Sequence, residues 1–541
     1  MNRSWNQIWK RGDVFVWGAG AILAITLIML AGLLLSIFLN AAPFFWEDEL
    51  VQLSLAGGRT VLGEIKEREA VPDPENPAAS LKYRIQLKQG NRDLYGTDHI
   101  WIDEKNIRNR ELPKNALAVE RREWGIFFGY LEAVRVDKET LEGGTRGMKV
   151  LQDHLPRALE THEKARKIQK QQIGKINFYL EKNRLRLKKL EAGGIASGEA
   201  VQQLQNQNRE YRKTLKKLES LLGQLRSRET GEAVFRTADG KEKRIPFSKI
   251  IRVQTPNRMN LLDRLRFFSI RVWEFIFDDP RESNTEGGIF PAIFGTVMMV
   301  LIMTLFATPL GILAALYLRE YARQGLWVSA VRIAVNNLAG VPSIVFGVFG
   351  VGFFIYFIGG SIDKFFFSES LPAPTFGTGG ILWASLTMTL LTVPVVIVSI
   401  EEGLAAVPQS IREASLSLGA TKFETTWRVV LPAVMPSVLT GLILAMARAA
   451  GEVAPLMITG VVKLAPSLPL DDLWPFLHLE RKFMHLGFHI YDVGFQSPNV
   501  DAARPMVFAT TLLLILMVLL LNISAIVLRN RLRRKLSGSA L

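Results

Sequence analysis

The chain contains 541 residues, of which 48% are hydrophobic and 22% charged, with 66 Lys and Arg, 51 Asp and Glu and no cysteine. The absence of cysteine excludes disulfides, cysteine-ligated zinc, iron–sulfur clusters and thiol catalysis. In a soluble protein a net charge of +15 would suggest a nucleic-acid partner, but apolar and charged runs barely overlap along this chain. This separation favours a membrane protein.

Six apolar segments are long enough to cross a membrane, because roughly 20 apolar residues span the hydrocarbon core. The first, 14–39, and the last, 506–528, contain no charged residue. The four segments between them are rich in Gly, Ala, Ser and Thr, as closely packed membrane helices are, and cover about 288–318, 328–359, 379–400 and 436–460. A buried soluble helix is the alternative for any one of them, but four in succession predict a polytopic all-α membrane domain.

Flanking cations predict the orientation of these spans. The N-terminal tail, 1–13, and the C-terminal tail, 529–541, are both basic, so we expect both ends in the cytoplasm. The loop 401–432 then faces the cytoplasm, while residues 40–287 form a long extracytoplasmic insertion ahead of a membrane core at 288–528. The first apolar run exceeds the usual length of a signal-peptide core, so we interpret it as an anchor.

The insertion begins and ends with residues that alternate as β-strands do, over about 48–150 and 230–255. Turn residues separate successive strands and predict hairpins. The predicted strand pairs are 51–55 with 60–62, 83–87 with 99–102 around Gly90-Asn91, and 233–237 with 245–253 around Ala238-Asp239-Gly240. We therefore expect a small β domain.

The middle of the insertion, about 155–228, has apolar residues at spacings of three and four, interrupted by Gly193-Gly194. This pattern predicts an antiparallel hairpin of coiled-coil type. The segment contains 18 Lys and Arg against 7 Asp and Glu. The cations have two interpretations: a solvated helix surface, or an electrostatic arm for anionic headgroups, cell-wall polymer or an acidic protein.

The loop after the fourth span contains a spaced motif. It reads Glu413-Ala414-Ser415, three residues, Gly419, nine residues, then Val429-Val430-Leu431-Pro432. This pattern resembles the EAA signature of ABC importer permeases, with Ser415 and Val429 departing conservatively from Ala and Ile. Residues 411–418 predict a short helix, the kind of element that fits a groove in a partner protein. An ordinary amphipathic connector is the alternative.

Three further segments narrow the resemblance to the PstA-type permeases of phosphate ABC importers. These are Gly287–Thr296, Leu338–Gly347 and Ala447–Leu456. Val453 departs from the Thr that usually follows Gly-Glu in that family. The resemblance covers about 288–528 and the first span.

The resemblance implies the fold of a type I ABC importer permease with six transmembrane helices, located in the inner membrane. It implies as partners a PstC-like permease, a PstB-like ATPase dimer that contacts the chain at Glu413 and its neighbours Ala414, Ser415, Gly419, Leu431 and Pro432, and a PstS-like phosphate-binding protein. No G-x-x-x-x-G-K-[ST] motif occurs, so the chain lacks a P-loop and we expect ATP-Mg to bind the ATPase. We therefore expect a transporter subunit that is no enzyme and holds no cofactor or metal.

Arg448 and Glu452 are spaced i,i+4 in the fifth predicted span. Intramembrane charges are costly and usually indicate a transport pathway, and Arg can donate bidentately to phosphate. We predict Arg448, Glu452 and Ser343 as pathway residues. The alternative for the charged pair is an internal ion pair that locks helices together. Similarly, Gly340 and Pro342 would either kink the third span or permit close packing.

Other functions are less consistent with the sequence. His485 and His489 are spaced to share a helix face, but no acidic third ligand is placed beside them, so we predict no metal site. Import of another oxyanion or small solute is the nearest alternative function. A membrane sensor or scaffold is an alternative of a different class, but the cytoplasmic segments are too short for an output domain. The location of the basic segment outside the cell argues against nucleic acid.

Overall fold

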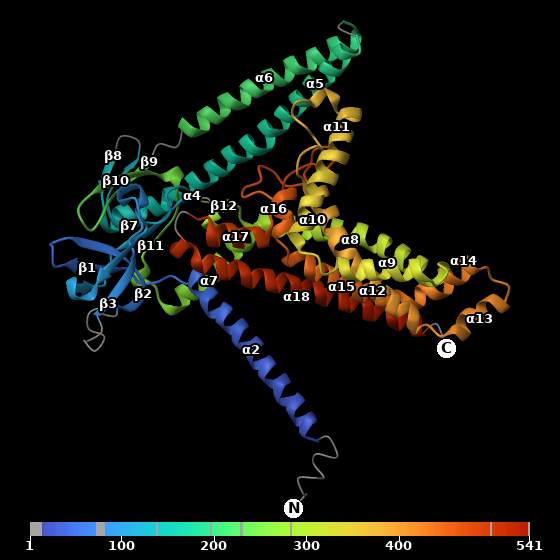
Figure 1. The fold of residues 1–541 in the computed structure, drawn as a ribbon. Helices are drawn as coiled ribbons and strands as arrows, with labels where there is room; N and C mark the ends of the chain where they lie inside the picture. The colour runs from blue at the N-terminus through green and yellow to red at the C-terminus, as the bar shows by residue number, and fades with distance from the viewer. Residues whose placement is uncertain are drawn as a thin grey trace, which may run out of the picture.

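The computed structural model describes residues 13–71, 82–136, 139–194, 197–227, 231–281, 284–497 and 500–538. Most of the predicted N-terminal tail lies outside these residues. Two parts are evident in Figure 1: β-sheets with a long helical hairpin, and a bundle of apolar helices. We call the end of the bundle beside the sheets the insertion end, and the end that carries residues 401–432 the coupling end.

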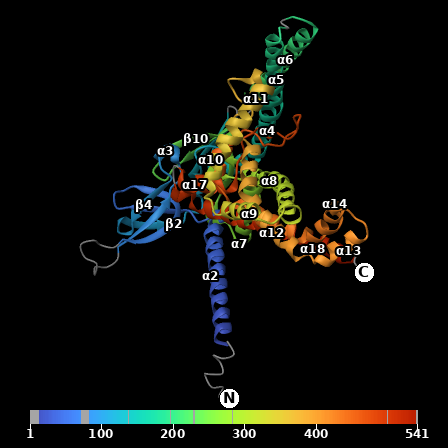
Figure 2. The ribbon, with the colours of Figure 1, turned by 45° about the vertical axis from the view of Figure 1, so that its right-hand side comes forward.

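Six helices of the described chain are long and apolar enough to span a membrane: Phe15–Phe45, Phe290–Tyr321, Ser343–Phe366, Ile381–Ala406, Lys422–Gly451 and Ala503–Arg531. Helix α12 (Ile381–Ala406) is the central one, with 67% of its most apolar window buried, against 6% for the windows of the first and last spans. It packs against α8 (Phe290–Leu316) and α15 (Leu431–Gly451). Helix α2 (Asp13–Phe45) contacts α18 (Val500–Gly538) and then diverges from the bundle (Figures 1 and 2).

Glycines allow the central helices to approach closely. A Cβ atom added to Gly311 of α8 would lie 2.5 Å from Val396 Cγ1 of α12. One added to Gly441 of α15 would lie 2.8 Å from Ser399 Cβ of α12. Because real Cβ atoms do not approach other carbons so closely, larger residues at these positions would separate the helices.

The third span differs from the predicted segment 328–359. Residues Leu326–Leu338 form a separate amphipathic helix, α9, with no fully buried residue. The helix is interrupted at 339–342. A new helix begins at Ser343 and comprises α10 (Ser343–Phe349), a π-helical stretch at 350–359 and α11 (Gly360–Phe366). Pro342 caps α10, so Gly340 and Pro342 separate two helices and do not kink one.

The strands of the insertion form two larger antiparallel sheets and a short two-stranded one, β12 (Pro280–Arg281) with β13 (Glu286–Gly287). The five-stranded sheet has the order β4-β3-β2-β1-β5, and the six-stranded sheet has the order β10-β9-β7-β6-β11 with β8 paired to β7. Their bounds are β1 Val51–Leu55, β2 Thr60–Val71, β3 Lys82–Lys88, β4 His99–Asp103, β5 Ile107–Glu111, β6 Leu117–Arg121, β7 Phe127–Val136, β8 Glu139–Glu142, β9 Gly231–Arg236, β10 Glu242–Pro246 and β11 Ile250–Gln254. A short helix, α3 (Arg92–Tyr95), follows Gly90 and Asn91, which both have positive φ angles.

The predicted strand 245–253 is two strands in the structure. Residues up to Pro246 pair with β9, whereas β11 pairs with β6, and a 3₁₀ turn at Phe247–Lys249 separates them. The side chain of Phe247 is buried in the core of the six-stranded sheet together with Leu151 of α4 (Gly144–Lys167). Helix α4 therefore covers one face of that sheet.

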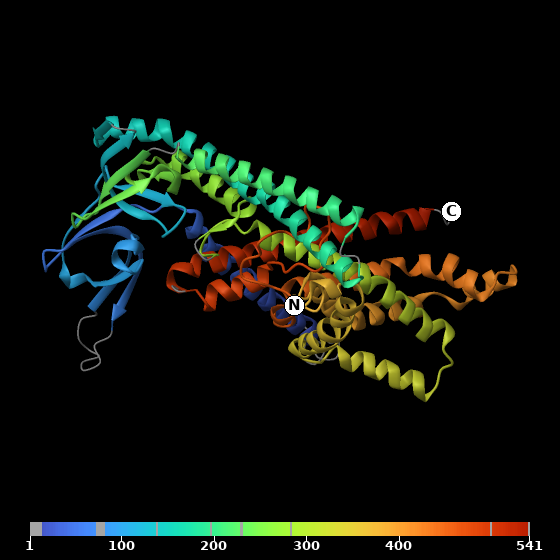
Figure 3. The same cartoon turned by 90° about the horizontal axis from the view of Figure 1, so that it is seen from above.

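The helical hairpin consists of α4, a π-helical stretch at Ile168–Ile173, α5 (Gly174–Ala192) and α6 (Glu199–Ser227). We call it the arm. Tyr179 of α5 and Tyr211 of α6 stack with ring centroids 5.8 Å apart. Seen from above, the arm runs alongside the helix bundle from the sheets outward (Figure 3).

Helix α7 (Leu261–Phe277) connects the sheets to the bundle and lies between the predicted β portion and the predicted second span, where no element was predicted. Asn260 and Asp263 form a capping box at its start. Phe275 packs against Phe44 and Phe45 at the end of α2, with ring centroids 5.3 Å apart in both pairs. Five of its large apolar side chains remain strongly exposed: Leu261, Leu262, Leu265, Trp273 and Phe277. This amphipathic character suits a helix lying at a membrane surface.

A buried ion pair fixes the six-stranded sheet, and its loss should destabilise the insertion. The side chains of Arg121 and Asp93 are 4% and 6% exposed and share two contacts of 3.1 Å. Arg121 also donates to the Gly125 and Trp124 carbonyls. Arg121→Met leaves Asp93 with Lys243 alone, so we expect a loss of about 3 kcal/mol in pulse proteolysis across a urea series.

The matched control is Arg135→Met. Arg135 pairs with Glu232 in the same sheet, but both side chains are about one-third exposed. We expect this control to cost less than about 1 kcal/mol. Equal losses for the two variants would contradict a special contribution from the buried pair.

Candidate functional site

The predicted pathway pair lies at the end of α15 nearest the insertion. Arg448 is in the last turn of the helix, and Glu452 follows Gly451 in an extended conformation. The two residues therefore do not share a helix face as predicted, and Arg448 lies closer to the end of the span than to its middle. Their side chains still approach, with Arg448 Nε 3.5 Å from Glu452 Oε1, and are 34% and 22% exposed. The pair is thus accessible to a solute.

Ser343 is the first residue of α10, whereas Glu452 leads into α16 (Ala454–Thr459). These two short helices pack directly, since a Cβ added to Gly347 would lie 2.7 Å from Pro455 Cα. Within the described residues, Ser343 makes no side-chain hydrogen bond to Arg448 or Glu452. Helix packing therefore links the elements carrying the predicted pathway residues, but no direct contact joins all three.

The coupling end presents a short helix, α13 (Gln409–Ser417), followed by a turn at Gly419, where φ is +87°. Ser415 Oγ lies 2.9 Å from Thr425 Oγ1 and ties α13 to α14 (Lys422–Thr425). Leu431 and Pro432 lie in the first turn of α15, after a π-helical stretch. Glu413 and Ala414 are exposed. The predicted coupling residues thus cluster at one end of the bundle (Figure 2).

The sequence analysis missed the residue that anchors α13. Arg412 donates to the carbonyl groups of Val407 and Leu404, and its guanidinium lies 2.8 Å from Glu320 at the end of the second span. Apolar side chains nearby remain exposed: Ile411, Leu416, Leu418, Phe423 and Trp427, with Leu418 89% exposed. An anchored helix beside an exposed apolar surface is an arrangement suited to a partner protein.

The two histidines of the predicted i,i+4 pair are buried. His485 caps α17 (Leu486–Phe495), and His489 lies one turn further along it. Burial lowers the pKa of His485 to about 3 and that of His489 to about 4, so both rings are neutral at physiological pH. Asp492 pairs with Lys463 at 3.1 Å. In the described part of the chain, no three His, Asp or Glu side chains converge as a metal site requires.

The arm contacts three separate loops at the insertion end of the bundle. Lys170 lies 3.3 Å from Asp279, ahead of α8. Lys175 lies 3.4 Å from Asp472, in the loop between α16 and α17. Near its tip, Lys188 donates to the Leu371 carbonyl at 2.9 Å, between α11 and α12. Part of the arm's positive charge is therefore paired with the membrane core.

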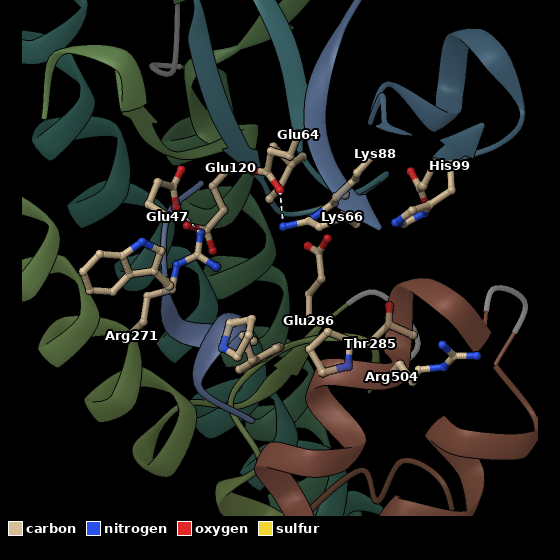
Figure 4. Close-up of a pocket in the computed structure, with 18 of the residues that line it drawn as sticks. Glu47, Glu64, Lys66, Lys88, His99, Glu120, Arg271, Thr285, Glu286 and Arg504 are labelled. Atoms are coloured by element: carbon tan, nitrogen blue, oxygen red, sulfur yellow. Dashed lines mark hydrogen bonds and ion pairs between the residues drawn. The ribbon is translucent and has the colours of Figure 1, made fainter. Parts of the chain in front are cut away.

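A charged cavity lies where α2, α7, α18 and the five-stranded sheet meet (Figure 4). Its volume is about 310 Å³. Carboxylates and cations enter it from all sides, among them Glu47, Glu64, Lys66, Lys88, Glu120, Arg271, Arg281 and Glu286. We call it the charged cavity. Sequence reasoning missed it because its residues come from segments more than 200 positions apart, and no spacing signal connects them.

Burial and neighbouring charges shift the pKa values of the carboxyl groups in the charged cavity in opposite directions. Burial raises the pKa of Glu47 to about 7, and burial also raises the pKa of Glu286. Burial acts on Glu120 in the same direction, but Arg271 and Arg281 outweigh it and lower the pKa of that carboxyl. Glu47 and Glu286 therefore lack full compensation for their negative charge.

Glu47 should make stability depend on pH. Its pKa is higher in the folded chain than the ordinary value of 4.5, so the folded state binds more protons than the unfolded state between these values. The free energy of unfolding contributed by this group therefore falls as pH rises through that window. We expect Glu47→Gln to reduce the drop in thermal midpoint between pH 5 and pH 7 for the full chain in detergent. Glu49→Gln, at a largely exposed carboxylate, should keep the wild-type drop, and an unchanged drop in Glu47→Gln would contradict the assignment.

The membrane core is similar in sequence to known transport proteins. Residues 307–538 match the family of binding-protein-dependent transport system inner membrane components. A phosphate transport system permease protein PstA of Yersinia pestis is 37% identical over 184 residues, 34% of this chain and 56% of that protein. PstA 1 of Mycobacterium tuberculosis is 36% identical over 185 residues, 34% of this chain and 54% of that protein. A probable ABC transporter permease, YqgH of Bacillus subtilis, is 32% identical over 196 residues, 36% and 59% of the two chains.

The chain thus spans little more than half the length of these curated relatives. Residues 307–538 are thus similar to inner membrane components of transport systems, and the relatives named above are described as transporter permease proteins. Within this class, the relatives confirm the resemblance to PstA-type permeases that the motifs indicated.

Two solved transporters are also similar over the core. The methionine transporter MetNI in an inward-facing conformation gives a TM-score of 0.33 at 17% identity, covering 44% of this chain and 94% of that one. A bacterial alginate transporter in complex with its alginate-bound periplasmic protein gives 0.32 at 12% identity, covering 49% and 87%.

Proposed function

We propose that the chain is the PstA-like permease subunit of an ATP-driven importer of inorganic phosphate. The observation that carries this proposal is the half-buried pair of Arg448 and Glu452 at the end of α15, within the segment that resembles PstA permeases. Arg448 can donate bidentately to an oxyanion, and Glu452 reduces the attraction so that the anion can leave. In this proposal the core has the type I ABC importer permease fold.

The coupling end supports a partner that supplies the energy. The exposed apolar side chains of α13 and α14, next to the anchored Glu413 segment, offer a surface for a PstB-like ATPase dimer that binds ATP-Mg. A PstC-like permease would complete the pathway, and a PstS-like binding protein would deliver phosphate at the insertion end. The insertion would then be extracytoplasmic, with both termini in the cytoplasm of the bacterial cell.

The decisive test is transport by the reconstituted complex. We expect ATP-driven uptake of labelled phosphate that excess sulfate does not suppress. Suppression by sulfate or molybdate would instead favour a permease for another oxyanion. Absence of oxyanion uptake in an assembled, ATP-hydrolysing complex would contradict the phosphate assignment.

We also infer that the arm stays anchored on the permease in the assembled transporter. Lys175 and Lys188 of the arm reach two loops of the core, Lys170 reaches Asp279 just ahead of it, and Lys189 lies 3.8 Å from Glu369 beside the tip. Because the chain contains no cysteine, paired cysteines can be introduced without a background. We expect Lys189→Cys with Glu369→Cys to cross-link in membranes with a short bifunctional maleimide. A pair of Lys216→Cys with Glu369→Cys should not react, and failure of the first pair would contradict anchoring.

A further inference from the structure

The charged cavity has the layout of a site for an amphiphile. At one end it is bounded by Asn40, Pro43 and Phe44 in the last turns of the first span, and by Pro505 and Phe508 in the first turns of the last span. At the other end it reaches Glu64 and Lys88 in the five-stranded sheet. One end therefore consists of residues from membrane helices, and the other consists of ionised side chains of an extramembrane domain.

The surroundings place this cavity beside lipid. Helix α7 forms one wall with Arg271, Glu274 and Phe275, and exposes Leu261, Leu262 and Trp273 on other positions of the same helix. The windows of both spans that border the cavity are only 6% buried within the chain. A lipid molecule next to these helices would have its headgroup at the level of the charged side chains.

Two side chains of opposite charge in the cavity act on each other electrostatically but make no direct contact. Lys88 and Glu286 line it, and neither makes an ion pair or a side-chain hydrogen bond within the residues that the structure describes. Arg271 Nε is also buried without a hydrogen-bond partner. By contrast, Lys66 is fully engaged, with Asp48 and Glu64 both 2.6 Å away. Figure 4 shows Glu286 directed upward toward the strand residues Lys66 and Lys88, with Glu47 and Arg271 beside them.

A carboxylate and an ammonium group that are partly buried without a direct partner are each costly, and one ligand with both charges would satisfy both. A primary ammonium group donates up to three hydrogen bonds and suits Glu286 and Glu47. A phosphodiester accepts from Lys88 and from the free Nε of Arg271. Burial raises the pKa values of Glu47 and Glu286, and the nearby cations Arg271 and Lys88 offset this effect only in part.

We propose that the charged cavity binds the phosphoethanolamine headgroup of a membrane phospholipid, with its phosphate beside Lys88 and Arg271 and its ammonium group beside Glu286 and Glu47. The cavity volume of about 310 Å³ accommodates a headgroup, and the acyl chains lie along the exposed surfaces of α2 and α18. The lipid thereby joins the insertion to the first and last spans. This inference needs the membrane location of the core but not phosphate as the transported solute.

The test is native mass spectrometry of the full chain, released from detergent with an equimolar mixture of dioleoyl phosphatidylethanolamine, phosphatidylcholine and phosphatidylglycerol. We expect retention of phosphatidylethanolamine over each competitor by at least about fivefold. Lys88→Met and Glu286→Gln should each abolish this preference. The control Lys216→Met, on the exposed face of α6, should retain it. Gel filtration of the variants would establish that they fold.

Other patterns of lipid retention would contradict the proposed headgroup site. Equal retention of the three lipids, or a preference that survives both variants, overturns the proposal. Preference for phosphatidylglycerol would mean that the cations alone bind and would overturn the role of Glu286. A second arm adds soluble O-phosphoethanolamine at millimolar concentration and measures the thermal midpoint. Stabilisation by this compound without any lipid preference would overturn the membrane as the source of the ligand.

Discussion

Replacing Arg448 with Gln should reduce phosphate uptake by the reconstituted complex by at least about tenfold. The side chain is 34% exposed, and among the described residues its only ion pair is with Glu452 at 3.5 Å, so a guanidinium is available to an anion without breaking a tight ion pair. Gln keeps similar length and polarity but loses the permanent charge and the bidentate donors. Uptake of labelled phosphate into proteoliposomes, with the amount of assembled complex measured in parallel, tests this expectation.

Two variants separate transport from structure. Lys364→Gln removes an exposed cation on α11, so uptake should remain near the wild-type rate. Glu452→Gln leaves Arg448 without its counter-charge, so phosphate should be held longer and uptake should fall at high phosphate concentration. If Arg448→Gln transports normally in an intact complex, the pair is an internal lock between segments and the pathway role is wrong.

Reversing the charge of Glu413 should reduce both phosphate uptake and the ATP hydrolysis that drives it. Glu413 is exposed on α13 and its side chain has no partner among the described residues; only its carbonyl oxygen accepts a hydrogen bond, from Ser417. Its substitution should therefore leave the chain folded while altering contact with the ATPase. We expect Glu413→Arg to lower phosphate-dependent ATP hydrolysis and uptake by about tenfold or more.

The comparison variant is Gln409→Arg, which introduces the same charge at the start of the same helix. It should have a smaller effect because position 409 lies outside the EAA motif. Equal thermal midpoints for both variants would show that folding is preserved. Full activity of Glu413→Arg would mean that α13 does not form the ATPase contact.

Residue patterns predicted the number of membrane spans but not where individual helices begin and end. Long apolar runs identified all six spans, because hydropathy integrates over about 20 residues and tolerates local errors. The third span was misplaced because the apolar residues of the amphipathic α9 are followed closely by those of α10, and only the short segment 339–342 separates the two helices. The spacing of apolar residues likewise did not predict that α15 ends at Gly451. Arg448 and Glu452, spaced i,i+4, were therefore expected on one helix face.

The candidate sites also differ in how far the sequence could predict them. The coupling residues are close in sequence, so a spaced motif could identify them. The anchor of α13 joins Arg412 to Glu320, 92 residues apart, and the charged cavity joins Glu47 to Glu286 and Arg504, more than 200 residues apart. Such pairings depend on tertiary packing and not on local pattern. The arm's contacts with Asp279, Asp472 and Leu371 belong to the same class.

The glycines of the three central helices have a mechanical consequence. Gly311, Gly403 and Gly441 leave no room for even one additional methyl group between α8, α12 and α15. Sliding these helices past one another would drive backbone into side chain, so the three should translate and rotate as a single rigid body. Any rearrangement during transport must then be absorbed at its edges, where α10 meets α16 and where the peripheral α2 and α18 border lipid.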